Sequence, residues 1–81
     1  MIDIETLRDY FIQDTIVLSE HAKNRCRERQ IKQKDVKNCI MTGEIIEQYP
    51  DDFPFPSCLV YGHAADNRII HVVISSEGEC G

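Results

Sequence analysis

The change in hydrophobic pattern near Gly43 is the feature that most constrains the fold of this chain. Before it, apolar residues recur at the spacing of amphipathic helices, as Ile4, Leu7 and Phe11 do. After it, runs rich in Val and Ile alternate with prolines and turn residues, which is typical of strands. At 81 residues the chain has room for one core. The sequence therefore predicts one α+β domain over residues 1–81.

Three helices are expected in the first half of the chain, over residues 3–13, 19–30 and 33–42. Asp3 and Ser19 are favoured at helix N-caps, because their side-chain oxygens accept a backbone N–H bond. Ile31 and Val36 bracket the start of the third helix as a hydrophobic staple. Gly43 follows the last periodic residue and predicts a left-handed cap. The three helices should pack on the sheet that follows.

Three strands are expected to form an antiparallel sheet, over residues 44–49, 58–64 and 68–75. The segment 50–56 contains three prolines and cannot continue the first strand, since proline lacks the N–H that a strand ladder needs. The third strand holds an almost continuous apolar run from Ile69 to Ile74. Such a run predicts a central strand that is covered on both faces.

The end of the chain bears on the edge of this sheet. Glu77 and Gly78 indicate a hairpin turn, but no further strand is predicted after it. A central strand without a neighbour exposes backbone hydrogen-bonding groups at an open edge. We expect this edge to pair with a second copy of the chain, as in a homodimer, or with a partner protein.

The net charge and its distribution along the chain bear on whether the protein binds nucleic acid. The net charge is −5, so general attraction to nucleic acid is not predicted. Residues 23–37 nevertheless hold seven basic side chains against two acidic ones. This segment is either a solvated helix face or an anion-binding surface.

Four cysteines are present, with no CxxC pair and no zinc-type spacing. We expect reduced thiols in a cytoplasmic protein, with no metal and no cofactor. No apolar run approaches the length of a membrane span, so no membrane association is predicted.

Several short motifs occur in a specific order along the chain: SEHA at 19–22, then Arg25, Arg29 and Ile31, GEIIEQYP at 43–50, residues 54–59, Gly62, and His71 to Val73. With these motifs the chain resembles domain-of-unknown-function family 4258 over about residues 3–75. Members of that family are similar in layout to the compact barnase/RelE-like ribonuclease toxins, and many occur beside antitoxin-like partners. The resemblance implies a toxin-like endoribonuclease with RNA and an antitoxin protein as partners. It also implies that the final strand of the family pattern is lacking here.

One set of side chains has the chemistry for RNA cleavage. His21 and Arg25 are one helical turn apart, Arg29 follows a turn later, and His71 lies on the third strand. Metal-independent cleavage needs a base, an acid and a cation beside the phosphate. We predict His21, His71 and Arg25 as catalytic residues, with Arg29 and Tyr61 as substrate- or phosphate-binding residues.

Other interpretations stay open from sequence. A histidine on an apolar strand is commonly a satisfied core residue, and Arg25 can pair with Glu28 or Glu47 instead of a ligand. Whether the chain is an enzyme is therefore not decided. The alternatives to an endoribonuclease are a non-catalytic, dimerising interaction module and a metal-binding regulator.

Overall fold

The computed structural model describes residues 1–13 and 16–80, with backbone alone at residues 79–80. Its elements in chain order are α1 (Ile4–Ile12), β1 (Val17–Leu18), α2 (Glu20–Glu28), α3 (Gln33–Thr42), β2 (Glu44–Tyr49), β3 (Ser57–His63), β4 (Ile69–Ser75) and β5 (Glu79–Cys80). Three helices and the antiparallel strands β2, β3 and β4 confirm the predicted α+β class. Each of these six elements begins and ends within two residues of its predicted bounds.

The helix starts follow from local capping, as predicted. The carboxylate of Asp3 accepts a hydrogen bond from the N–H of Glu5 at 3.2 Å, and Ser19 Oγ accepts one from Ala22 at 3.1 Å. These bonds satisfy N–H groups that have no partner inside a helix. Short-range chemistry therefore sets where α1 and α2 begin.

The left-handed cap expected at Gly43 is wrong. Gly43 ends α3 with φ −93° and ψ −166°, an extended conformation open to any residue. A side chain here would instead collide with the backbone carbonyls of Cys39 and Tyr61. Glycine is required because β3 passes close to the end of α3, which is a tertiary reason.

The sheet contains five strands in the order β1-β5-β4-β3-β2. The turn at Gly78, where φ is +79°, leads into β5, which pairs with β4 through Ile74 and Cys80. β1 then pairs parallel to β5, with Val17 opposite Glu79. The expectation that no strand follows the turn is wrong. Two-residue strands carry no periodic signal, and they form here because distant segments meet.

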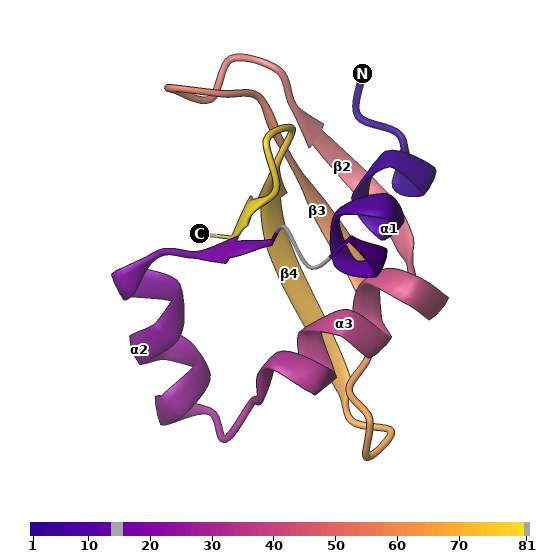
Figure 1. Cartoon of the computed structure of the whole chain (residues 1–81), viewed down its shortest axis with the longest axis vertical. Coiled ribbons are helices and arrows are strands. Elements are labelled where there is room, and N and C mark those ends of the chain that lie inside the picture. The colour runs from indigo at the N-terminus through magenta and orange to yellow at the C-terminus, as the bar shows by residue number, and fades with distance from the viewer. Residues whose placement is uncertain (14–15, 81) are drawn as a thin grey trace.

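α1 and α3 cover one face of the sheet. α3 contacts β3 and β4, and α1 packs against α3 (Figure 1). Along β4, Ile70 and Ile74 are buried whereas Ile69 and His71 are exposed. The expected two-sided coverage of this strand is therefore wrong, and β3 is central among the three long strands. Buried and exposed side chains alternate along β4, but the sequence does not show this alternation, because the strand carries aliphatic residues on both faces.

α2 departs from the expected packing of three helices on the sheet. It lies beside β4, displaced from the layer that α1 and α3 form (Figure 1). The largest fully buried side chains accordingly come from α1, α3 and the long strands: Leu7, Cys39, Ile40, Cys58, Val60 and Ile74. Within the described residues, no helix is both long and apolar enough to cross a membrane.

Two of the cysteines belong to this core. Cys39 and Cys58 are fully buried, and Cys26 is half-buried. All three are free thiols. Burial raises the pKa of the Cys39 and Cys58 thiols to about 11, so both remain protonated near neutral pH.

Candidate functional site

A cavity of about 100 Å³ lies between α2 and the outer edge of β4. Arg25 and Arg29 line it from the helix side, and His71 lines it from the strand side. Its remaining lining is largely apolar: Leu18, Ala22, Cys26, Ile31, Val36, Val72 and Val73. The structure thus brings together three of the five predicted site residues, although 42 positions separate Arg29 from His71 in the sequence.

The helix side of the cavity is one face of α2. The residues at positions 22, 25, 26 and 29 recur at the helical spacing that aligns side chains along a helix. Ala22 is 5% exposed and anchors this face, while Arg25 and Arg29 are exposed. Apolar packing therefore positions two cations at the rim of the cavity.

Both guanidinium groups at this rim are unpaired within the part of the chain that the structure describes. Among the described residues, the side chains of Arg25 and Arg29 form no hydrogen bond or ion pair. The suggested pairing of Arg25 with Glu28 or Glu47 is thus not formed. Each arginine keeps its full set of donors for an anionic ligand.

His71 is the histidine that lines the strand side. It is exposed on the sheet face that the helices leave uncovered. Its ring lies edge-to-face with Tyr61, its cross-strand neighbour, with the ring centroids 5.3 Å apart. In the described part of the chain its imidazole nitrogens have no hydrogen-bond partner. The surroundings are those of an accessible histidine and differ from those of a satisfied core residue.

The other two predicted residues are placed differently. Tyr61 lies next to the cavity through its contact with His71. His21 is exposed at the start of α2 and is not among the residues that line the cavity. The structure therefore gathers Arg25, Arg29, His71 and the adjacent Tyr61, and it leaves His21 on the flank of this group.

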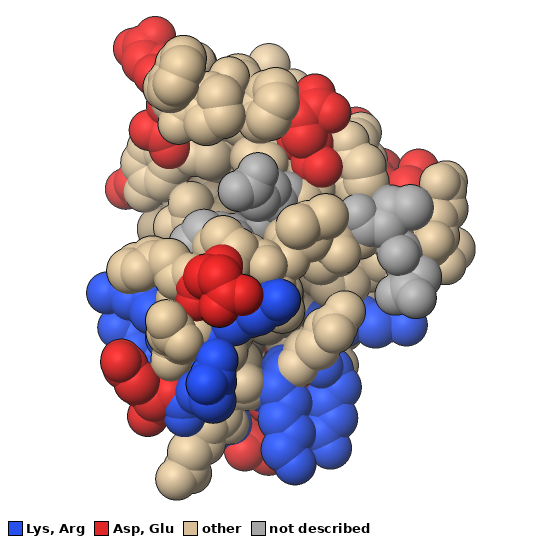
Figure 2. Space-filling model, turned by 60° about the vertical axis from the view of Figure 1, so that its left-hand side comes forward, with Lys and Arg blue, Asp and Glu red and all other residues tan. Residues whose placement is uncertain are grey.

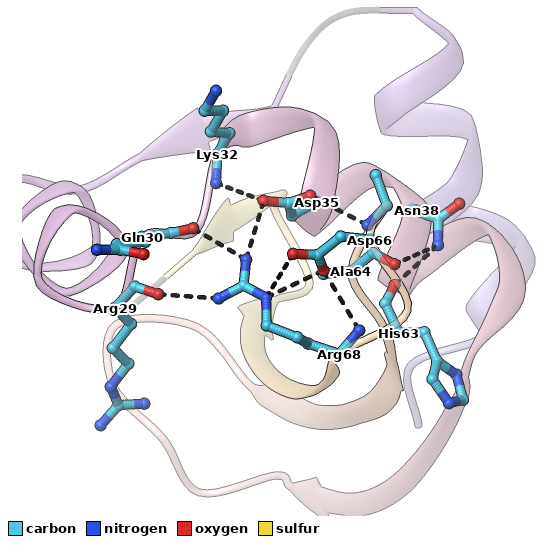
Figure 3. Close-up of polar contacts among 10 residues, drawn as sticks. Arg29, Gln30, Lys32, Asp35, Asn38, His63, Ala64, Asp66 and Arg68 are labelled. Carbon is cyan, nitrogen blue, oxygen red and sulfur yellow. Dashed lines mark hydrogen bonds and ion pairs between the residues drawn. The ribbon is translucent and has the colours of Figure 1, made fainter.

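Arg68 fixes the position of α2, a role that sequence reasoning missed. Its guanidinium donates to the carbonyls of Arg29 and Gln30 at 3.1 and 2.9 Å, and its Nε donates to Asp66 at 2.7 Å (Figure 3). A weaker ion pair, with N and O 3.7 Å apart, joins it to Asp35. These bonds hold the C-terminal end of α2, and with it Arg29, against the β3–β4 turn. No local pattern signals this role, because the partners are 38 and 39 positions away.

Asp35 completes the same network from α3 (Figure 3). Its side chain is buried and accepts hydrogen bonds from the N–H groups of Lys32, at 2.8 Å, and Ala65, at 3.0 Å. The bond from Lys32 is the main cause that lowers the pKa of this carboxyl, and Ala65 and Arg68 act in the same direction. The ionised carboxylate joins the start of α3 to the turn before β4.

Positive charge gathers around the cavity. Figure 2 shows Lys and Arg side chains concentrated in the lower half of the molecule, over α2 and the start of α3. All seven basic side chains of residues 23–37 are exposed. Among the described residues, no group of three or more His, Cys, Asp or Glu is arranged to hold a metal ion.

The fold and this site define a small α+β domain with helices on one sheet face and a basic cavity at the sheet edge. The chain belongs to the family described as Domain of unknown function (DUF4258), whose model matches residues 18–81. Every residue that lines the cavity lies inside the match, whereas α1 lies before it. The predicted family is thereby confirmed, and its relation to barnase/RelE-like toxins stays a prediction. No curated protein and no solved structure matches the chain.

Proposed function

We propose that this domain is a metal-independent endoribonuclease that cleaves RNA at the cavity between α2 and β4. The observation that carries the proposal is the convergence of Arg25, Arg29 and His71 on one cavity, with none of the three side chains in a hydrogen bond or ion pair within the described residues. In the cell it would act as the toxin of a toxin–antitoxin pair in the cytoplasm, which the resemblance noted in the sequence supports.

The chemistry follows from the groups present. His71 accepts the proton of a ribose 2′-hydroxyl, and the 2′-oxygen attacks the adjacent phosphorus. Arg25 and Arg29 donate to the phosphate oxygens as negative charge accumulates on them. The bond to the 5′-oxygen breaks, and this oxygen takes a proton from water. The hydroxide that remains takes the proton from the His71 imidazolium, which restores the histidine. The products are a 2′,3′-cyclic phosphate and a free 5′-hydroxyl.

The test is cleavage of a labelled single-stranded RNA, with detection of the cyclic phosphate terminus. His71→Ala should lower the rate constant roughly 100-fold or more, since positioned acid–base catalysis contributes about that much. Thr6→Ala is the control, because Thr6 is exposed on α1 and does not line the cavity. Equal cleavage by the unchanged chain and His71→Ala would contradict the proposal. A His21→Ala arm decides whether His21 takes part.

The edge of β4 favours a second candidate function, a non-catalytic module that dimerises through its sheet. Among the described residues, the pairing of β4 on its outer side is at Ile74, and Ile69 near the other end is 59% exposed. Sedimentation equilibrium at micromolar concentration should then show a dimer, which Ile69→Lys weakens by placing charge at the edge. A monomer at every concentration would count against this function.

A further inference from the structure

We propose that Tyr61 is a base-stacking residue, which holds one nucleobase of a single-stranded RNA beside the phosphate bound in the cavity. This inference rests on the proposed function and deepens it by naming the substrate class. Tyr61 is half-buried on the uncovered face of the sheet, in contact with the cavity residue His71. A nucleotide whose phosphate meets Arg25 and Arg29 can therefore extend its base over this face.

The aromatic surface at this point is larger than a single ring. The ring centroid of His63 lies 6.4 Å from that of Tyr61, and the centroid of His71 lies 5.3 Å from it. The three side chains project to the same face, since His63 is two positions from Tyr61 on β3 and His71 is directly opposite on β4. Aromatic side chains on a sheet face are platforms on which unpaired bases stack.

Charge sets the direction in which a strand of RNA can cross this face. Two exposed basic side chains that line the cavity, Arg25 and Arg29, lie on the His71 side of Tyr61. On its other side β2 presents Glu44 directly opposite Tyr61, and Glu47 opposite Leu59, and both glutamates are exposed. Carboxylates repel phosphates, so the RNA runs from the basic segment over His71 and ends at Tyr61. The site is accordingly short, with one base on the tyrosine.

This arrangement selects unpaired RNA. In a duplex the faces of the bases are already covered by their neighbours, and a base can reach an aromatic side chain only after it leaves the stack. A single strand presents such a face without that cost. Binding of single strands should therefore exceed binding of a duplex with the same phosphates.

The experiment measures binding of dye-labelled 2′-O-methyl RNA hexamers by fluorescence anisotropy at low salt. The methyl group removes the nucleophilic hydroxyl, so that binding is read without cleavage. Tyr61→Ala should raise Kd by about 5- to 150-fold, the range of base–aromatic stacking, and Tyr61→Phe should retain affinity. Tyr49→Ala is the control, because Tyr49 lies on the acidic strand with its hydroxyl on Glu47.

A second measurement uses the unchanged protein and does not depend on the folding of a variant. Hexamers with one abasic site are compared position by position, and loss of the base at one position should lower the affinity for the unchanged chain. Equal binding of intact and abasic hexamers, or of single strand and duplex, overturns the stacking role and leaves the cleavage test with His71→Ala standing. Absence of any single-strand binding at low salt overturns both proposals.

Discussion

Single residues in this protein carry structural roles that extend well beyond their own elements. Asp35 lies in the first turn of α3, where it accepts the N–H of Lys32. In the structure it also accepts the N–H of Ala65, 30 positions away, and faces the guanidinium of Arg68. Arg68 in turn bonds to the carbonyls at the end of α2. Two side chains thus connect both helices to one turn of the sheet.

Asp35 should make stability depend on pH in a defined direction. Its pKa is lowered in the folded protein, so its contribution is fully present above the ordinary aspartate value of about 3.9 and is lost as the pH falls through the folded value. We expect the free energy of unfolding to decrease below about pH 4. Asp35→Asn should be less stable at pH 7 and should lose less on acidification. Urea unfolding at pH 7, 5, 4 and 3 measures both effects.

The control for this prediction is Asp51→Asn, which changes an exposed aspartate in the loop between β2 and β3. It removes the same formal charge without touching the network around Arg68. An acid sensitivity in Asp35→Asn equal to that of the control and of the unchanged chain would contradict the assignment.

At the scale of elements, α1 supports the domain although it lies before the family match. Its buried residues Leu7 and Phe11 belong to the common core. Arg8 on the same helix donates to the carbonyls of Ile40 and Gly43 at 3.1 and 3.2 Å. These carbonyls lie at the C-terminal end of α3, where intrahelical partners run out. α1 therefore packs α3 against the sheet, and it supplies hydrogen-bond donors to the carbonyls at the C-terminal end of α3.

Shortening a core side chain of α1 should lower the free energy of unfolding. Leu7 is completely buried, so Leu7→Ala leaves a cavity and should lower the free energy of unfolding by about 2–5 kcal/mol. Ile12→Ala on the same helix is the control, because Ile12 is 66% exposed and should change stability little. Chemical denaturation monitored by circular dichroism gives both values. Equal stability of the two variants would show that α1 is not part of the cooperative core.

At the scale of the whole molecule, helices on one face and charge at one end define what remains accessible. The net charge is −5, yet the basic side chains of residues 23–37 collect over α2 and the start of α3. Because α1 and α3 cover one face of the sheet, the other face keeps Tyr61 and His71 open. The basic surface and the open face meet at the cavity beside β4. RNA cleavage at the cavity and base stacking on Tyr61, the two proposals, both depend on basic side chains lying beside the open face.

The sequence by itself determined the class of fold and the bounds of its main elements. Asp3 and Ser19 start helices through bonds to the next few residues, and the prolines of residues 50–56 separate two strands through their own backbone chemistry. The basic and aromatic residues of the candidate site were also selected from sequence, because their chemistry belongs to the side chain.

Tertiary structure alone decided which of these residues meet. The cavity exists because Arg68 and the pairing of β1 with β5 place α2 beside β4. Those contacts join segments 38 or more positions apart, where no periodic pattern or cap can signal them. Long-range contacts also leave His21 outside the cavity lining. They require glycine at position 43, because β3 passes close to the end of α3 there. Local chemistry thus specified the parts, and contacts distant in sequence specified the site.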